Sequence, residues 1–176
     1  MIDTYIALGA NLGEPILAFQ NALRQVNAHS HCSVLRVSGV YRSKAFEAEG
    51  PDYLNAVAKV KTELSAPELL ELLQGIELSA GRVRAYHHQP RTLDLDVLFF
   101  GRARVESKNL QIPHPRWRER AFVLWPLQDV SEGLVSQQDL DAVKDQSIQK
   151  VGELVWAQGD QSLPDILCAS SICTSK

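Results

Sequence analysis

The chain of 176 residues is predicted to adopt an α+β fold of the ferredoxin-like type, with a central, mostly antiparallel sheet flanked by helices in three layers (αβα). Two observations lead to this prediction. Strand and helix patterns follow one another in the order β-α-β-β-α-β, which is the order of a split βαβ unit. The length suits one domain with a full core. We therefore expect a single domain at 1–160 and a disordered tail of small and polar residues at 161–176.

The first half of the chain supplies three of these elements. Residues 4–8 form the short apolar run of a buried strand, and the glycine-containing segment 9–13 ends it. Apolar residues then recur at helical spacing over 14–28. Residues 34–41 are strand-like, and a Gly-Pro pair marks a loop over 43–52.

A clear alternation begins the second half of the unit. Over 53–64, apolar and polar residues alternate as in a strand with one buried face. Ser65 and Glu68 then have the spacing of a capping box, which predicts a helix that ends near Gly81. Residues 92–100 are again strand-like.

Weaker signals follow toward the C-terminus. His114 lies between two prolines, and proline disfavours helical backbone in the residue before it, so we expect 113–115 to be extended. A short apolar segment at 118–127 and a last helix around 147–157 complete the prediction.

The charges are distributed unevenly. The chain has 18 Lys and Arg residues against 21 Asp and Glu residues, a formal net charge of −3. This balance argues against nucleic acid or a membrane surface as a partner. Between Arg82 and Arg120, however, nine basic residues face only four acidic ones, a local balance of +5. That stretch is either a solvated surface or a site for an anion.

The cysteines and the N-terminus indicate the compartment. Cys32, Cys168 and Cys173 have neither disulfide-framework nor zinc-knuckle spacing. The first residues lack the features of a signal peptide, and no apolar run reaches the roughly 18 residues of a membrane span. We expect a cytoplasmic protein, and a monomer.

Asp94 and Asp96 are the sharpest chemical feature. Residues i and i+2 of a strand point to the same face, so the two carboxylates lie side by side while Leu93, Leu95 and Val97 face the core. A hard cation such as Mg²⁺ would relieve their repulsion, and Mg²⁺ is typically bound by one or two carboxylates plus substrate phosphates. The alternative is an edge strand with solvated charges, but Asp is disfavoured inside strands.

Arginines surround this pair in the sequence. Arg82, Arg84 and Arg91 precede it, and the guanidinium group suits phosphate oxygens. Carboxylates for Mg²⁺ beside arginines describe a phosphoryl-transfer site. The chain has no P-loop motif. Segment 9–13 could be a phosphate cradle or a plain strand-to-helix turn.

Several segments also match a known family, in order, over roughly residues 4–130. They are Tyr5-Ile-Ala-Leu-Gly-Ala-Asn-Leu-Gly13, Val40-Tyr41-Arg42-Ser43, Pro51-Asp52-Tyr53-Leu54-Asn55-Ala56, Ile76-Glu77-Leu78 with Gly81-Arg82-Val83-Arg84, Pro90-Arg91-Thr92-Leu93-Asp94-Leu95-Asp96, and Ile112-Pro113-His114-Pro115 with Arg120-Ala121-Phe122-Val123-Leu124-Trp125-Pro126-Leu127. Through them the chain resembles the 6-hydroxymethyl-7,8-dihydropterin pyrophosphokinase family (HPPK) of folate biosynthesis.

The resemblance implies an ATP-dependent diphosphotransferase. A hydroxymethyl-dihydropterin oxygen would attack the β-phosphorus of ATP and release AMP. By resemblance, Asp94 and Asp96 hold two Mg²⁺ ions, and they form the catalytic set together with Arg82 and Arg91. The residues implied to bind ATP are Gln74, Glu77, Arg82, Arg84, Arg91, Val97 and His114.

The resemblance also implies a pterin site. Tyr53 and Phe122 match stacking positions, Asn55 matches a contact with the pterin edge, and the backbone of 43–46 reads the other edge. The full implied set is Gly9, Ser43, Lys44, Phe46, Tyr53, Asn55, Asp94 and Phe122.

Two loops depart from the family pattern. Residues 85–89 lack the basic residues and the tryptophan of the family's lid, and Ser43-Lys44-Ala45-Phe46 replaces threonine followed by prolines. Two other interpretations therefore stay open. One is a paralogue that binds pterin or nucleotide with weak or altered transfer, and the other is a nucleotidyltransferase that releases pyrophosphate.

Overall fold

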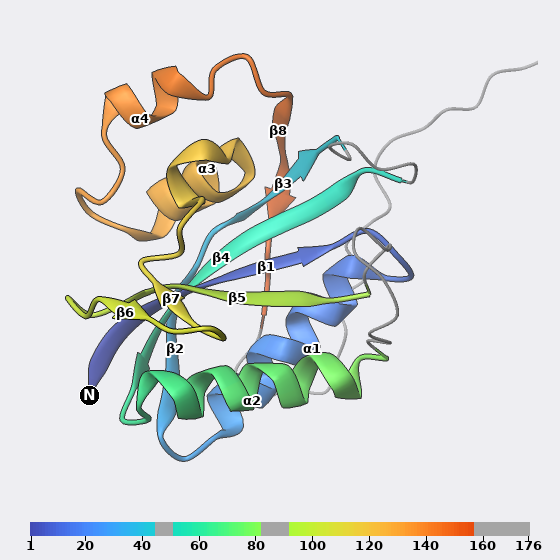
Figure 1. The fold of residues 1–176 in the computed structure, drawn as a ribbon. Helices are drawn as coiled ribbons and strands as arrows, with labels where there is room; N and C mark the ends of the chain where they lie inside the picture. Colours follow the sequence, from blue (N-terminus) through green and yellow to red (C-terminus); the bar gives the residue numbers. More distant parts are fainter. Residues whose placement is uncertain (45–50, 82–91, 157–176) are drawn as a thin grey trace, which may run out of the picture.

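The computed structural model of the chain describes residues 1–44, 51–81 and 92–156. These ranges contain both helices and a mainly antiparallel sheet, so the α+β class is confirmed (Figure 1). The elements are β1 (Ile2–Ala10), α1 (Pro15–Ala28), β2 (Cys32–Val37), β3 (Gly39–Ser43), β4 (Tyr53–Thr62), α2 (Ala66–Ser79), β5 (Asp94–Phe100), β6 (Val105–Glu106), β7 (Gln111–Ile112), the 3-10 helix η1 (Trp117–Glu119), α3 (Ala121–Val130), α4 (Gln137–Ala142) and β8 (Ile148–Glu153).

Six strands form the main sheet, in the order β5-β1-β4-β3-β8, and β2 also pairs with β4. Every pairing between these strands is antiparallel. Strand β5, which carries the aspartate pair, lies at one edge, and β8 lies at the other. Strands β6 and β7 form a separate two-stranded ribbon.

The sheet separates two hydrophobic clusters. One lies between the sheet and helices α1 and α2 and includes Phe19 and Leu73. The other includes Val57 of β4 and Leu124 of α3. Figure 1 shows α1 and α2 on one side of the sheet and α3 with α4 on the other. Apolar side chains on both faces of the sheet thus hold helices on both sides.

Strand β4 is buried on both faces between residues 55 and 58. Ala56 and Ala58 belong to the cluster under α1 and α2, whereas Val57 is 0% exposed in the cluster with α3. The prediction of one buried face is therefore wrong for this part of the strand. The physical reason is that α3 covers the second face, which no local pattern in β4 could indicate.

Helix α2 begins with the predicted capping box. The Ser65 N–H and Oγ each donate to Glu68 Oε2 at 2.7 Å, and the Glu68 N–H donates to Ser65 Oγ at 3.5 Å. Shortly after the helix ends, Gly81 has φ +85°, a left-handed conformation that favours glycine. Both ends of the helix are therefore set by local sequence.

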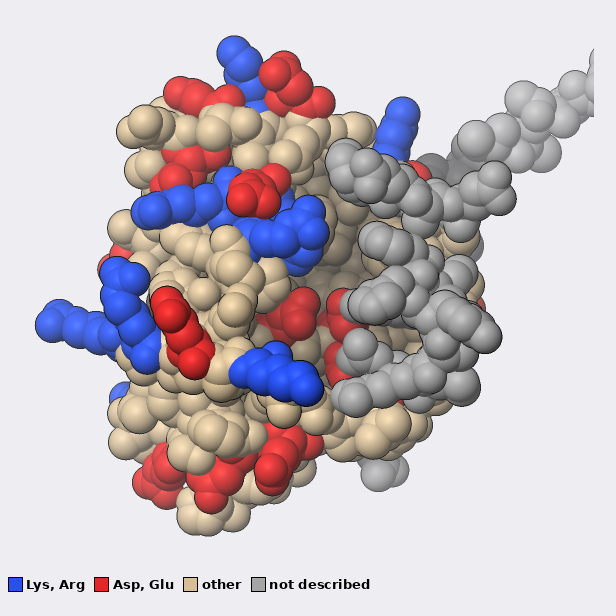
Figure 2. Space-filling view, viewed as in Figure 1, with Lys and Arg blue, Asp and Glu red and all other residues tan. Residues whose placement is uncertain are grey.

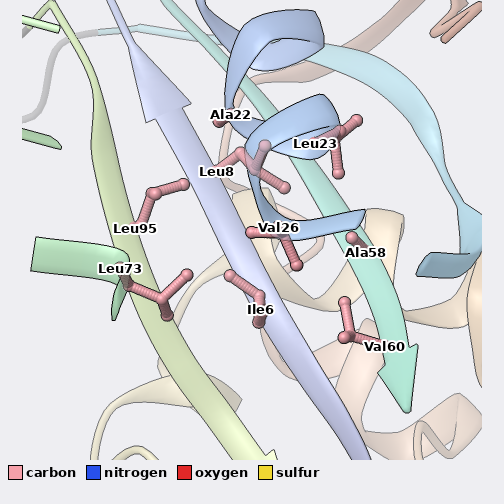
Figure 3. A pocket seen from close by; sticks show the side chains of 9 residues that line it. All are labelled: Ile6, Leu8, Ala22, Leu23, Val26, Ala58, Val60, Leu73 and Leu95. Carbon is pink, nitrogen blue, oxygen red and sulfur yellow. The ribbon is translucent and has the colours of Figure 1, made fainter. Parts of the chain in front are cut away.

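A small cavity lies in the core between α1, α2 and the sheet. Its volume is about 10 Å³, and Figure 3 shows the apolar side chains that point into it. They offer no hydrogen-bond partner to a polar ligand, so this cavity is a packing defect of the core. The lining residues are Ile6, Leu8, Ala22, Leu23, Val26, Ala58, Val60, Leu73 and Leu95.

Two strand and helix predictions need correction. The strand expected over 34–41 is interrupted at Ser38, which separates β2 from β3. The Ser38 side chain donates to Gly39 O at 2.7 Å and accepts from the Val57 N–H at 2.9 Å, and these bonds stabilise the break. The apolar segment at 118–127 becomes η1 and α3, and α4 was not predicted.

The helix expected around 147–157 is wrong, because 148–153 form strand β8, which pairs with β3. The contacts that select a strand are remote in sequence. Lys150 Nζ lies 3.5 Å from an oxygen of Asp129, and that carboxylate also accepts from the Gly39 N–H at 3.0 Å and from the Tyr41 hydroxyl.

The predicted tail at 161–176 lies outside the described residues. Within the residues that are described, no helix has the length and hydrophobicity needed to cross a membrane.

Candidate functional site

Three neighbouring strands place candidate residues in one row across the sheet. In the strand register, Gly9 of β1 faces Asn55 of β4 on one side and Asp94 of β5 on the other. Since side chains alternate along strands, this row lies on the face of the sheet opposite α1 and α2. The register thus brings together three residues that were predicted to bind the pterin and are far apart in sequence.

The next register position carries the second aspartate. Asp96 faces Ala7, and it points to the same side as Asp94 because the two are separated by one residue. Both aspartates are half-buried, whereas Leu93 and Leu95 are buried in the core. The predicted alternation is confirmed. Val97, implied to contact ATP, is also buried in the cluster under α1 and α2.

The aspartate pair suits a hard cation. Two carboxylates supply oxygen ligands, the donors that Mg²⁺ prefers, and Mg²⁺ usually takes its remaining ligands from water and phosphate. The described residues contain no group of three or more His, Cys, Asp and Glu side chains that could hold a metal ion. Water and phosphate oxygens are the usual further ligands of a Mg²⁺ ion that one or two carboxylates hold.

His114 lies beside β5 and interacts electrostatically with Asp94. Burial, followed by the charges of Arg120 and Arg116, lowers the pKa of His114 to about 4, although Asp94 opposes the shift. The imidazole is therefore uncharged near pH 7. Its Nδ1 accepts from the Arg116 N–H at 3.2 Å, so the proton resides on Nε2. The His114 backbone N–H donates to Leu98 O at 2.9 Å and fixes the residue beside β5.

Arg120 is a candidate site residue to which the sequence analysis gave no role. Burial and Arg116 lower its pKa, while Asp96 and Asp94 raise it, so the guanidinium lies in the field of both aspartates. Its Cζ lies 5.5 Å from the ring centroid of Phe122. The signal was present, since Arg120 opens the segment that carries Phe122.

Basic and acidic side chains share the face of the molecule drawn in Figure 2. In Figure 2, Asp and Glu side chains lie close together near the centre of the view, with Lys and Arg side chains above and below them. A negatively charged ligand that brings its own cation would be complementary to such a surface.

Asn55, a predicted pterin-site residue, has a defined hydrogen-bond arrangement. Asn55 is 5% exposed, and its Nδ2 donates to Ser43 Oγ at 3.0 Å and to Tyr41 O at 3.3 Å. Its Oδ1 is directed toward Gly9, where an added Cβ would lie 3.7 Å away. Gly9 does not have a positive φ, so backbone conformation does not require glycine there.

The remaining predicted residues are placed as follows. Tyr53 opens β4 and is half-buried, Phe122 packs against the cluster under α3, and Lys44 is exposed. Gln74 is half-buried on α2. Glu77 is 1% exposed, and its Oε1 accepts from the Leu95 N–H at 2.8 Å. Four predicted residues lie outside the described part of the chain: Phe46, Arg82, Arg84 and Arg91.

Comparisons with known proteins identify the family of this chain. Residues 5–132 match the family described as 7,8-dihydro-6-hydroxymethylpterin-pyrophosphokinase. The chain is 43% identical over 136 residues to the 2-amino-4-hydroxy-6-hydroxymethyldihydropteridine pyrophosphokinase of Haemophilus influenzae, covering 77% of this chain and 85% of the relative. The enzyme of the same name from Bacillus subtilis is 39% identical over 155 residues, covering 88% and 90%.

Solved structures support the fold. The chain resembles wild-type HPPK-DHPS of Plasmodium falciparum with a TM-score of 0.58 at 15% identity. The similarity covers 83% of this chain and 45% of that longer chain. Together with the match over residues 5–132 and the two bacterial relatives, the row of Asn55, Gly9 and Asp94 leads to one conclusion: the chain belongs to the 7,8-dihydro-6-hydroxymethylpterin-pyrophosphokinase family.

Proposed function

We propose that this chain transfers pyrophosphate from ATP to 6-hydroxymethyl-7,8-dihydropterin. The hydroxymethyl oxygen forms a bond to the β-phosphorus of ATP and loses its proton. The bond between that phosphorus and the oxygen bridging to the α-phosphate breaks, and AMP leaves with this oxygen. The observation that carries the proposal is the row of Asn55, Gly9 and Asp94, which joins the pterin-site residues to the aspartate pair.

Asp94 and Asp96 are proposed to hold two Mg²⁺ ions together with phosphate oxygens. When bound, Mg²⁺ supplies neutralisation of phosphate charge and orients the phosphates. The side-by-side carboxylates and their partial burial support this role.

Two described residues act on the phosphates directly in this proposal. Neutral His114 donates a hydrogen bond from Nε2, and Arg120 provides a fixed positive charge beside the aspartates. Arg82, Arg84 and Arg91 are proposed to bind the triphosphate, with Gln74, Glu77 and Val97 on the nucleotide side. Catalysis then consists mainly of aligning the hydroxymethyl oxygen with the β-phosphorus and of stabilising the negative charge on the phosphates.

The pterin is proposed to lie on the sheet over Gly9. The absence of a side chain at Gly9 leaves room for a flat ring, and Asn55 Oδ1 can accept from its polar edge. Tyr53 and Phe122 supply aromatic faces. Ser43, Lys44 and Phe46 contribute the loop on the other edge.

Broader properties of the protein are part of the same proposal. The order β5-β1-β4-β3 supports a ferredoxin-like unit, and the pairing of β8 with β3 supports one domain over 1–160. We also propose a cytoplasmic monomer that acts on two small-molecule substrates, with no nucleic-acid or membrane partner.

A product assay tests the proposed reaction. Purified protein, Mg²⁺ and ATP should release AMP only when the hydroxymethyl-dihydropterin is added. Asp94→Asn and Asp96→Asn should abolish this release, whereas Asp145→Asn, an exposed acid in the segment before β8, should not. Pterin binding without turnover would instead identify a binding paralogue, and pyrophosphate release would identify a nucleotidyltransferase; either outcome refutes the proposal.

A further inference from the structure

One backbone N–H of β5, that of Leu95, donates to a side chain outside the sheet. Strand β5 lies at the edge of the sheet and pairs there with β1 alone. In an antiparallel pair, successive residues direct their N–H groups alternately toward the partner strand and away from it. The Leu95 N–H donates to a side chain of α2, so it points away from β1, toward the open edge.

The acceptor at this open edge is the Glu77 carboxylate. Glu77 Oε1 lies 2.8 Å from the Leu95 nitrogen, and the whole residue is 1% exposed. Glu77 therefore stands where a further strand would place a carbonyl oxygen. A carboxylate is a stronger acceptor than a carbonyl group, because hydrogen bonds to charged groups are shorter and stronger.

The position of Leu95 gives this bond a chemical consequence. Leu95 lies between Asp94 and Asp96, with its own side chain in the core at 5% exposure. The bond to Glu77 holds the Leu95 N–H on the outer side of β5, and the pairing with β1 holds the strand on its inner side. Together they fix the peptide units from which Asp94 and Asp96 project. The distance between the two carboxylates depends on those peptide units.

We propose that Glu77 is a positioning residue, which acts through the Leu95 N–H to hold Asp94 and Asp96 in the geometry needed for a divalent cation. This inference rests on the proposed function. It gives Glu77 a part in the reaction that is separate from contact with the nucleotide.

Two variants of Glu77 separate this role from packing. Glu77→Met removes the acceptor at similar length, whereas Glu77→Gln keeps an acceptor oxygen without the charge. Loss of an outer-shell partner weakens metal affinity or activity by about 10–100-fold. We expect Glu77→Met to raise the Mg²⁺ concentration needed for half-maximal activity at least about tenfold. Glu77→Gln should reverse most of this increase. The KM for the pterin should change by less than about twofold.

Leu69→Ala is the matched control for stability. Leu69 lies on the same buried face of α2 and is 0% exposed, so its truncation destabilises the core without removing the bond to Leu95. The Mg²⁺ requirement of Leu69→Ala should match that of the wild type. An equal shift in Leu69→Ala and Glu77→Met would overturn the proposal.

Two further measurements do not depend on turnover. Mn²⁺ binding in the presence of α,β-methylene ATP, followed by electron paramagnetic resonance, should weaken in Glu77→Met and not in Leu69→Ala. Amide hydrogen exchange in the wild type should show the Leu95 N–H protected like the amides of β4, although β5 is an edge strand. Rapid exchange at Leu95 would refute the proposal even if Glu77→Met failed to fold. Absence of AMP release by the wild type would count against the proposed reaction instead, and would leave these two measurements valid.

Discussion

Replacing His114 should change how the stability of the protein depends on pH. The variant His114→Asn removes the titrating ring while keeping an oxygen near the position of Nδ1, which accepts from the Arg116 N–H. Burial, Arg120 and Arg116 together lower the pKa of His114 to about 4, against the opposing effect of Asp94.

The sign follows from proton binding in the two states. With a lowered pKa, His114 binds fewer protons in the folded protein than in the unfolded chain at any pH between about 4 and the unperturbed value of about 6.5. The stability associated with neutral His114 is therefore complete above about pH 6.5 and is lost as the pH falls toward about 4. Below that pH no further loss comes from this group.

The magnitude follows from the size of the shift. Each pKa unit corresponds to about 1.4 kcal/mol, which gives a ceiling of about 3 kcal/mol for the shift to about 4. His114 is only half-buried, and solvent screening reduces this to about 1–2 kcal/mol.

Urea unfolding followed by tryptophan fluorescence, near pH 7.5 and near pH 4.5, measures this difference. Between the two conditions, the wild type should lose about 1–2 kcal/mol more unfolding free energy than His114→Asn. His29→Asn is the matched control, because His29 Nδ1 also accepts from the N–H two residues later, at 3.3 Å. If wild type and His114→Asn show the same pH dependence within about 0.5 kcal/mol, the account of His114 is refuted.

Three further substitutions test the pterin site, the cap and the core. Gly9→Ala should fold normally, since the new Cβ meets only Asn55 Oδ1 at 3.7 Å, but pterin binding measured by calorimetry should weaken about tenfold. The control is Gly75→Ala, because nothing lies within 4 Å of a Cβ added there. Unchanged pterin binding by Gly9→Ala would contradict the placement of the pterin. Ser65→Ala should lower the unfolding free energy by about 1 kcal/mol through loss of the capping box, measured by urea unfolding, and no loss would contradict its role. Leu73→Ala should lower the free energy of unfolding by about 2–5 kcal/mol in the same assay, because it enlarges an existing cavity. A loss well below this range would mean that the helix moves into the space left by the side chain.

The sequence predicted the features that depend on neighbouring residues. The alternation around Asp94 and Asp96 and the capping box at Ser65 are local patterns, and both are confirmed. Gly9 and Asn55 were identified as candidate site residues only through resemblance to a family, whereas Asp94 also followed from the strand alternation. The strand register then brought the three together.

The features that sequence reasoning missed depend on contacts remote in the chain. Residues 148–153 form a strand because β3 offers an open edge and Asp129 a carboxylate for Lys150, neither of which a local pattern reveals. Val57 is buried because α3 covers it. The same limitation applied to the bond between Glu77 of α2 and Leu95 of β5, because it joins two different elements.

The late return of the chain to β3 has a consequence during synthesis on the ribosome. Strands β1, β4 and β5, which carry Gly9, Asn55 and the aspartates, are complete once residue 100 has emerged. The outer edge of β3 receives its partner only when Ile148–Glu153 follows. Until then, Gly39–Ser43 presents open backbone groups that another nascent chain could pair with. Translation therefore completes the strands of the proposed substrate site well before it closes the outer edge of β3.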